Sequence, residues 1–364
     1  MTEPYRLDKH STMELGLLTL GDHRADPATG VRTTQAERHR DILEYLDYAE
    51  PAGFDAVFVG EHHFSDFITA SPPVFLGWLA GRTSTITLGS GVTLLPHHDA
   101  VKVAEDFATV DVVSDGRAEV WVGRGVEPYA YTYFGQDVQR AVDMQREGLE
   151  LLLRLWTESD VTWSGEFRPP LNGVTLQPRP VQEPCIPIKV AVSREESAIA
   201  AAELGLGISI TMLSFDRNQL APVVAAYQEA FSDAGHAHNP WVDLHAHVHV
   251  APTSQEARDH LSIYQAPFQR WVFGKRMGVH EDEVELPARV TDFASPECAV
   301  VNGSPEEVVD RIGAFTSLAP IDRFTIQSDY GGQPWPLVMR SLDLFGGVMD
   351  QVRALQPAPA LAQA

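Results

Sequence analysis

Short runs of apolar residues alternate along this chain with longer segments in which apolar positions recur every three or four residues. The short runs have the length and the β-branched composition of buried strands, and the longer segments have the periodicity of amphipathic helices. Eight strands are predicted in this way. They are Glu14–Leu18, Ala56–Val59, Thr87–Leu95, Glu119–Gly123, Ile188–Val192, Ile208–Met212, Leu244–Ala251 and Phe324–Gln327.

Helical segments lie between these strands and after the last one. Their boundaries carry ordinary signals. In the stretch GSPEEVVDRI, Ser304 is placed to cap a helix, Pro305 begins it, and two glutamates follow in its electropositive first turn. The predicted helices are Thr34–Ala52, Val74–Arg82, Val101–Ser114, Arg140–Trp156, Glu195–Leu204, Arg217–Ala234, Ser254–Ile263, Pro305–Ser317 and Trp335–Ala354.

Alternating strands and helices predict a parallel α/β sheet with right-handed crossovers, and eight strands are the number that closes a TIM barrel. No G-x-G-x-x-G sequence follows the first strand, which argues against an open dinucleotide-binding sheet. We therefore expect one (β/α)8 barrel domain over residues 13–354, an N-terminal extension over 1–12, and a flexible tail over 355–364. The weakly periodic segment Gln265–Val300 is expected to be an insertion or lid between strand seven and helix seven.

Composition narrows the possible partners and location of the protein. The 364 residues carry a formal net charge of −23, which argues against binding to nucleic acid or to an anionic membrane surface. The N-terminus lacks the pattern of a secretory signal, and no stretch approaches the roughly 20 apolar residues of a membrane helix. Two cysteines are too few for a disulfide framework, so we expect a cytoplasmic protein with reduced thiols.

In a barrel the active site lies at the C-terminal ends of the strands, so polar residues at those positions are candidates for function. His62 and His63 follow the second predicted strand, after Glu61. Adjacent residues of an extended segment point in opposite directions, so the two imidazoles are poorly placed to share one metal ion. The residues alone leave open whether either histidine moves protons or packs structurally.

A second candidate site follows the fifth predicted strand. Ser193 and Arg194 lie at the turn into a helix, and Ser197 lies one turn further on. Free N–H groups at a helix N-terminus attract phosphate, and Arg124 and Arg140 can add guanidinium charge. This arrangement predicts a monophosphate site. The alternative is that Ser193 is an ordinary helix cap, followed by glutamates that complement the helix dipole.

Three histidines at every second position, His245, His247 and His249, share one face of the seventh predicted strand. Two such imidazoles can ligate zinc in a barrel hydrolase, which also needs further ligands from other strands. Because the row spans the strand, we expect His245 to lie near the end opposite the active site. The alternative is a polar face that packs or meets solvent.

Four aromatic residues follow the fourth predicted strand in the stretch VGRGVEPYAYTYFG, namely Tyr129, Tyr131, Tyr133 and Phe134. Aromatic side chains at a barrel mouth can stack on a planar cofactor or an apolar substrate. They can equally form the wall of a loop.

Several stretches together resemble the bacterial luciferase-like flavin monooxygenases. They are GFDAVFVGEHHF, ITLGSGVTLLPHHDAVKVAEDFATVDVVSDGRAEVWVGRG, VNGSPEEVVDRI and FTIQSDYGGQPWPLVMRSLDLFGGVM. The resemblance extends from Met13 to about Val352. It implies a (β/α)8 barrel that binds FMN, or in some branches a deazaflavin, at its C-terminal mouth. It also implies a homodimer.

The resemblance assigns roles to particular residues. His62 matches the catalytic histidine of the EHHF motif, and Gly91 and Val92 match a non-proline cis peptide beneath the flavin ring. The residues implied to bind the flavin phosphate are Arg124, Arg140 with Arg146 as its competitor, Ser193, Arg194 and Ser197.

Two positions depart from the light-emitting luciferases. Gly123 stands where they carry a reactive cysteine, and Met212 stands where they carry a tryptophan, which argues against the aldehyde luciferase reaction itself. The leading prediction is a two-component monooxygenase that takes reduced FMN from a separate flavin reductase and uses O2 to oxygenate a small organic substrate, with no metal. The alternatives are a deazaflavin-dependent dehydrogenase or reductase and a metal-dependent barrel hydrolase.

Overall fold

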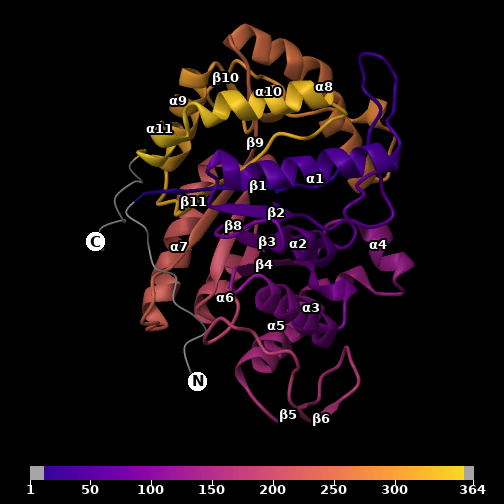
Figure 1. Ribbon diagram of the computed structural model, residues 1–364, viewed down its shortest axis with the longest axis vertical. Coiled ribbons are helices and arrows are strands. Elements are labelled where there is room, and N and C mark those ends of the chain that lie inside the picture. The colour runs from indigo at the N-terminus through magenta and orange to yellow at the C-terminus, as the bar shows by residue number, and fades with distance from the viewer. Residues whose placement is uncertain (1–11, 356–364) are drawn as a thin grey trace.

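Eight parallel strands form a closed barrel in the computed structural model, which describes residues 12–355 (Figure 1). The predicted extension and tail therefore lie almost entirely outside the described residues. Strand order runs β11-β1-β2-β3-β4-β7-β8, and β9 pairs with both β8 and β11 to close the ring, as predicted. The barrel strands are β1 (Glu14–Thr19), β2 (Ala56–Val59), β3 (Thr87–Leu94), β4 (Ala118–Gly123), β7 (Ile188–Val192), β8 (Gly207–Thr211), β9 (Val242–Val250) and β11 (Arg323–Gln327).

Helices surround the barrel, and the outward-facing strand residues pack against them in one large apolar core (Figure 1). The final predicted helix is two helices, because the first ends at Gly346 and the chain turns at Gly347 and Val348 before the second begins. The helices are α1 (Gln35–Ala52), α2 (Pro72–Ala80), α3 (Ala100–Val113), α4 (Pro128–Tyr133), α5 (Ala141–Thr157), α6 (Glu195–Glu203), α7 (Leu220–Asp233), α8 (Ser254–Met277), α9 (Pro305–Thr316), α10 (Trp335–Gly346) and α11 (Met349–Arg353).

The segment between β9 and α9 lies where it was predicted, but its structure differs from the prediction. Helix α8 continues to Met277, so the first part of Gln265–Val300 is helical although Pro267 lies inside it. Buried side chains such as Phe268 and Trp271 anchor this extension against a second apolar cluster. After two 3-10 turns, β10 (Val301–Gly303) pairs with the C-terminal end of β9.

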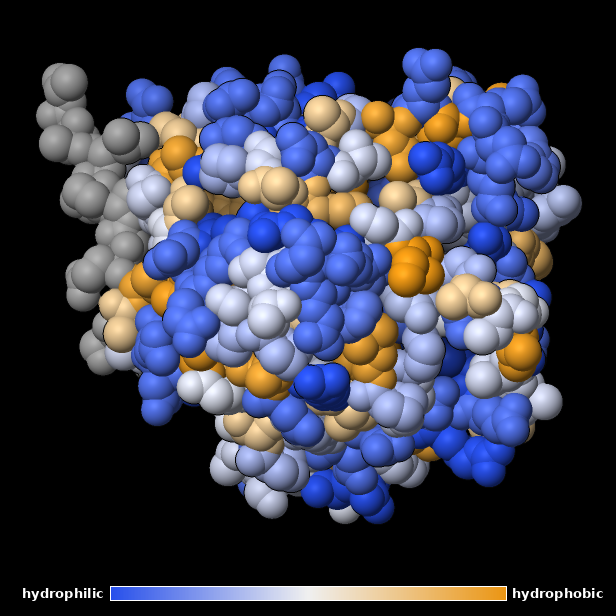
Figure 2. Space-filling view, turned by 90° about the horizontal axis from the view of Figure 1, so that it is seen from above, coloured by the Kyte–Doolittle hydropathy of each residue, from blue (hydrophilic) through white to orange (hydrophobic). Residues whose placement is uncertain are grey.

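The face seen in Figure 2 is mainly hydrophilic, and its apolar side chains appear as small separate patches. Residues 12–355 contain no helix with both the length and the apolar character of a membrane span. A short hairpin of β5 (Val161–Trp163) and β6 (Leu171–Val174) stands apart from the barrel.

Charged side chains fill the N-terminal end of the barrel interior. Arg323 donates to Glu119 at 2.8 Å and to Asp243 at 3.2 Å, and Lys189 donates to Glu119 at 2.8 Å. Burial alone would raise the pKa of Glu119, but the two cations outweigh it and hold that pKa at about 2. This cluster fills the N-terminal end of the barrel, so a site inside the barrel has room only at the C-terminal mouth.

Candidate active site

A cleft of about 240 Å³ opens at the C-terminal mouth of the barrel. It contains five of the residues predicted to form the site: His62, Gly91, Val92, Arg124 and Ser193. The other lining residues are Leu18, Leu20, Glu61, Leu94, Trp121, Gly123, Gly125, Val126, Glu127, Ala191, Val192, Ser209, Thr211, Phe215, His245 and Arg276.

His62 enters the cleft just beyond the end of β2. Its imidazole stacks on the Phe67 ring, with centroids 4.1 Å apart, and its Nδ1 lies 3.8 Å from Oε1 of Glu127. Burial lowers the pKa of His62 below its usual value, although the charge of Glu127 opposes this shift. At neutral pH the side chain is therefore a neutral imidazole that can accept a proton from a group in the cleft.

The peptide bond between Gly91 and Val92 is cis, as the resemblance implies. Pairing of β3 with β4 skips Val92, whose side chain lines the cleft. Gly123 lies opposite on β4, and a Cβ built there would come within 2.8 Å of Cγ2 of Val92. A cysteine at position 123 therefore has no room unless Val92 moves.

Arg124 and Ser193 follow the neighbouring strands β4 and β7, and both are exposed at the rim of the cleft. Arg194, not Ser193, is the N-cap of α6, so the interpretation of Ser193 as an ordinary cap is wrong. The Ser197 hydroxyl donates to the Arg194 carbonyl at 2.8 Å, and neither Arg194 nor Ser197 lines the cleft. The rim thus carries the guanidinium of Arg124 and the hydroxyl of Ser193 at the ends of neighbouring strands, and Arg276 adds a second guanidinium to the cleft.

Arg140 lies outside this cleft, contrary to the expectation that it joins Arg124. Its guanidinium makes two 2.9 Å bonds to Glu166 and one of 3.1 Å to Asp143, in a depression beside α5. Arg146 lines the same depression and pairs with Asp143 at 3.0 Å. Acidic partners near the start of α5 and in the following loop hold both arginines there.

His245 does line the cleft, so the expectation that it lies near the opposite end of the barrel is wrong. Strand β9 is nine residues long and extends past β8, so His245 pairs with Thr211, the last residue of β8. Burial lowers the pKa of His245 to about 3. Its Nε2 has no hydrogen-bond partner in the described part of the chain.

The other two histidines of β9 turn to different partners. His247 stacks on Tyr330, with centroids 4.3 Å apart, and its Nδ1 lies 3.1 Å from Oε1 of Gln265. His249 contacts His260 of α8 at 3.0 Å. The histidine row therefore does not converge on a common point, as a zinc site built from it would require.

Comparisons with known proteins agree with this geometry. Residues 13–320 match the model of the luciferase-like monooxygenase family. The chain belongs to this family. The structure is thus that of a monooxygenase-family enzyme, and the predicted family, fold and enzyme class are confirmed.

Individual family members show how far the likeness extends. The oxygenase component of flavin-dependent trigonelline monooxygenase from Acinetobacter baylyi is 26% identical over 314 residues, covering 82% of this chain and 85% of that protein. Monooxygenase RslO1 from Streptomyces bottropensis superposes with a TM-score of 0.82 at 26% identity, covering 92% of this chain and 98% of that one.

Two more distant structures share the fold and differ in cofactor. The oxygenating constituent of 3,6-diketocamphane monooxygenase from Pseudomonas putida, solved with FMN, has a TM-score of 0.76 at 20% identity over 96% of this chain and 100% of that one. An F420-dependent secondary alcohol dehydrogenase, solved with an F420-acetone adduct, has a TM-score of 0.72 at 20% identity over 94% and 99%. The fold alone therefore does not fix the cofactor.

The aromatic residues that follow β4 form a wall beside the cleft of this family member. Tyr133 and Phe134 pack edge-on against Phe64, and Phe134 also contacts His63. Tyr131 is buried, and its hydroxyl donates to the Arg124 carbonyl. These contacts favour the loop-wall interpretation over cofactor stacking, and they hold the backbone of Arg124 in place.

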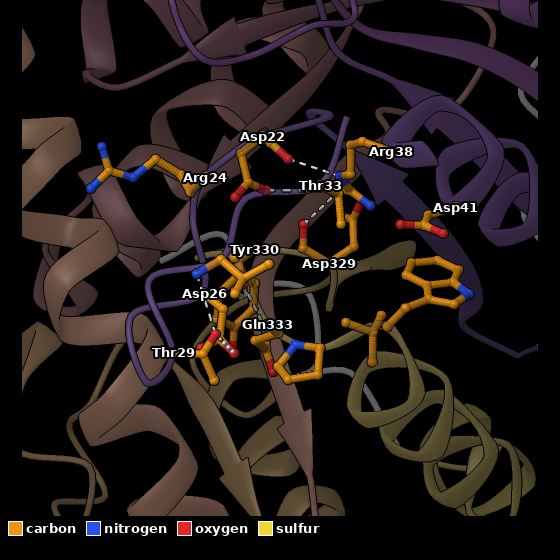
Figure 3. A pocket seen from close by; sticks show the side chains of 15 residues that line it. Asp22, Arg24, Asp26, Thr29, Thr33, Arg38, Asp41, Asp329, Tyr330 and Gln333 are labelled. Carbon is orange, nitrogen blue, oxygen red and sulfur yellow. Dashed lines mark hydrogen bonds and ion pairs between the residues drawn. The ribbon is translucent and has the colours of Figure 1, made fainter. Parts of the chain in front are cut away.

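A second cavity, of about 370 Å³, lies where the segments after β1 and β11 meet α1 and α10 (Figure 3). Arg38 reaches between two buried carboxylates there, at 2.7 Å from Asp329 and 4.0 Å from Asp22. Burial raises the pKa of Asp22 to about 7. Gly331 N–H donates to Asp22 and the Thr19 hydroxyl donates to Asp329, so the cluster ties both segments to the barrel mouth.

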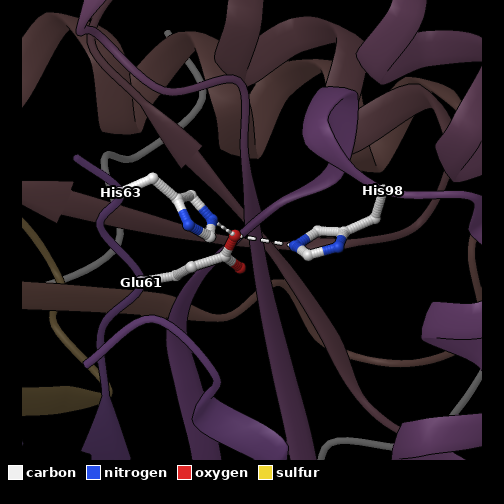
Figure 4. A group of neighbouring side chains, drawn as sticks. All are labelled: Glu61, His63 and His98. Atoms are coloured by element: carbon white, nitrogen blue, oxygen red, sulfur yellow. Dashed lines mark hydrogen bonds and ion pairs between the residues drawn. The ribbon is translucent and has the colours of Figure 1, made fainter. Parts of the chain in front are cut away.

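Glu61 follows β2, and its carboxylate lies between the imidazoles of His63 and His98 (Figure 4). One carboxylate oxygen lies 2.6 Å from Nε2 of His63 and 2.7 Å from Nε2 of His98, and the other accepts the Leu94 N–H at 3.1 Å. These ligand atoms lie within 4.8 Å of one another, so the three side chains are spaced as a metal site requires. The carboxylate already holds both imidazoles, so Glu61 braces the turn that follows β2.

We expect Glu61→Gln to lower the free energy of unfolding by about 2–3 kcal/mol near pH 6, because a buried, charge-assisted acceptor is lost. Burial opposes ionisation, but the bonds from His63 and His98 lower the pKa of Glu61 to about 2, so its contribution is present above pH 4.5. The pKa of His98 is raised from 6.5 against the effect of burial, because Glu61 bonds to it, and its contribution is lost as the pH rises through that raised pKa.

Urea unfolding at pH 6 and at pH 9 measures this difference. The loss in free energy of unfolding caused by Glu61→Gln should be larger at pH 6 than at pH 9. An equal deficit at both pH values would contradict the ion-pair account of the Glu61–His98 contact.

Proposed function

We propose that this protein is the oxygenase component of a two-component, FMN-dependent monooxygenase, which uses reduced FMN and O2 to oxygenate a small organic substrate. The observation that carries the proposal is one cleft in which three features meet. These are the rim formed by Arg124 and Ser193, the cis peptide Gly91–Val92 and the imidazole of His62. A guanidinium and a hydroxyl suit a phosphate group, and a flat peptide surface suits the flavin ring.

The chain's own residues divide the work in this proposal. Arg124 and Ser193 hold the phosphate of FMN at the rim. Val92 and Trp121 help to form an apolar pocket that excludes water from the reacting groups. Bound reduced flavin supplies the electrons that activate O2. His62, neutral at the working pH, accepts or returns a proton at its imidazole nitrogen.

A separate protein has to supply the reduced FMN, because the chain carries no nicotinamide-binding fingerprint. The name of the Acinetobacter relative as an oxygenase component supports a separate reductase. We further propose a cytoplasmic homodimer with one barrel domain over residues 13–354.

A deazaflavin is the second candidate cofactor, favoured by the F420-dependent dehydrogenase that shares the fold. Its ring has the same shape and would meet the same cleft residues. Such an enzyme would transfer hydride without consuming O2, so oxygen consumption separates the two functions.

The experiment is oxygen uptake with FMN kept reduced by an added flavin reductase and NADH, across a panel of small organic substrates. We expect substrate-dependent uptake above the reductase background and a product heavier by one oxygen atom. Deazaflavin-dependent turnover without oxygen uptake would support the second candidate instead. Stoichiometric zinc in the purified protein, with no flavin binding, would point to a metal hydrolase.

A further inference from the structure

His245 lines the cleft from β9, and one of its ring nitrogens is buried without a partner in the described part of the chain. His245 is 4% exposed, its Nδ1 lies 3.5 Å from the Thr211 hydroxyl, and its Nε2 has no hydrogen-bond partner in the described chain. Leaving a buried polar atom without a partner costs folding free energy, and such atoms in proteins usually have a partner. A ligand in the cleft would supply the missing partner.

The cleft has two walls of unlike chemistry. Leu18 and Leu20 from β1 and the loop after it, with Trp121 from β4, make one wall apolar. Ser209 and Thr211 from β8, with His245 from β9, make the other wall polar. The isoalloxazine ring has the same division, because its dimethylbenzene edge is apolar and its pyrimidine edge carries two carbonyls and an N–H.

We propose that His245 binds the pyrimidine edge of the flavin through Nε2, and that this wall sets the direction in which the ring enters the cleft. The inference rests on the proposed function and gives a flavin-binding role to a residue that the sequence pattern offered only as a zinc ligand. It applies to FMN and to a deazaflavin alike, because both carry the same pyrimidine edge.

The protonation state of His245 fits this role. Burial is the main reason that its pKa falls to about 3, with the charge of nearby His247 adding to the effect. The imidazole is therefore neutral across the physiological range, with one N–H and one lone pair. It can donate to a ring carbonyl or accept the ring N–H without bringing a charge into the barrel.

The same strand offers a matched control. His249 lies four residues after His245 on β9. It is also buried, and it also has a ring nitrogen without a hydrogen-bond partner in the described chain. Its other nitrogen contacts His260 of α8, and it does not line the cleft. Replacing His249 therefore removes a buried imidazole from β9 without touching the proposed flavin site.

The test is titration of the wild-type protein and three variants, His245→Leu, His245→Asn and His249→Leu, with oxidised FMN and with riboflavin. We expect His245→Leu to weaken both ligands by about tenfold and by the same factor, because both carry the pyrimidine edge. His245→Asn keeps a hydrogen-bonding side chain and should lose less. His249→Leu should bind both ligands as the wild type does.

The thermal unfolding midpoint of the ligand-free protein separates binding from a structural role. Leucine removes an unpartnered polar atom, so the midpoint of His245→Leu should equal or exceed that of the wild type. Wild-type affinity in His245→Leu would overturn the inference alone, as would weak binding accompanied by a midpoint below that of His249→Leu. A wild-type protein that binds neither ligand would overturn the proposed function, and this inference with it.

Discussion

Replacing His62 with asparagine should lower the turnover of the reduced-FMN-dependent oxygenation by at least about a hundredfold, the lower end of what a positioned acid or base contributes. Asparagine keeps a polar side chain of similar size but cannot take up a proton. His62 lies in the cleft with Nδ1 3.8 Å from Glu127, so the variant removes its imidazole from the cleft that the cis peptide Gly91–Val92 also lines. The measurement is kcat at saturating substrate and FMN.

The pH profile gives this prediction a second readout. Because burial lowers the pKa of His62, the neutral base is present at pH 7 and is lost only as the pH falls through that lowered pKa. The wild-type rate should therefore be level near neutrality and fall on the acid side, and His62→Asn should lack that acid limb. His39→Asn, which changes a half-buried histidine of α1 outside the cleft, serves as the control with unchanged turnover. A His62→Asn enzyme with wild-type kcat would show that His62 only packs.

Replacing Arg323 with methionine should lower the free energy of unfolding by about 3–5 kcal/mol, because the change leaves buried carboxylates facing a single lysine. Arg323 bonds to Glu119, Asp243 and Glu14 at 2.8, 3.2 and 2.7 Å and is 3% exposed. Arg32→Met is the matched control, since its partner Asp66 lies at the surface and such pairs contribute less than about 1 kcal/mol.

Acid unfolding tests the same cluster from the opposite direction. The pKa of Glu119 is held at about 2, so its contribution is present above pH 4.5 and lost as the pH falls toward 2. Removing Arg323 takes away one of the cations that oppose the effect of burial, so the variant should unfold at higher pH than the wild type. Equal urea stability of Arg323→Met and Arg32→Met would contradict the role given to the cluster.

The barrel was predictable because parallel strands buried on both faces read as continuous apolar runs. Strands Ala56–Val59 and Ile188–Val192 have the predicted bounds. The second half of α8 was not predictable, because Pro267 argues against a helix and only tertiary burial of its aromatic residues holds it. The hairpin Val161–Trp163 with Leu171–Val174 has strands too short to leave a pattern.

The charged cluster at the N-terminal end of the barrel interior could not be predicted from the individual strands. Glu119, Lys189 and Arg323 each fall at or near the start of a predicted strand, where a charged residue suggests a solvent-exposed end. Only closure of the ring brings them together inside the barrel. Their mutual contacts join strands that are far apart in the sequence, since Glu119 is 70 residues from Lys189 and 204 residues from Arg323.

The candidate site was predictable where residues follow directly after strands, as His62 and Arg124 do. The prediction was wrong for His245. The sequence does not show that β9 extends beyond the end of β8, which places residues from the middle of β9 at the barrel mouth. The prediction that Arg140 joins Arg124 was also wrong, because Arg140 pairs with Glu166, which lies in a loop with no recognisable sequence pattern. Ser209 could have been predicted to face the barrel interior, because side chains along a strand alternate between the inside and the outside of a barrel.

We propose that Arg124 and Ser193 bind the phosphate of FMN at the rim of the cleft. The most direct test of this contact is the affinity of Arg124→Ala for FMN and for riboflavin, which lacks the phosphate, with Arg140→Ala as the control. We expect Arg124→Ala to lose at least about tenfold in affinity for FMN and nothing in affinity for riboflavin, because a charge-assisted phosphate contact disappears. Arg140→Ala should bind both ligands like the wild type. Unchanged FMN affinity in Arg124→Ala, or a selective loss in Arg140→Ala, would contradict the claim.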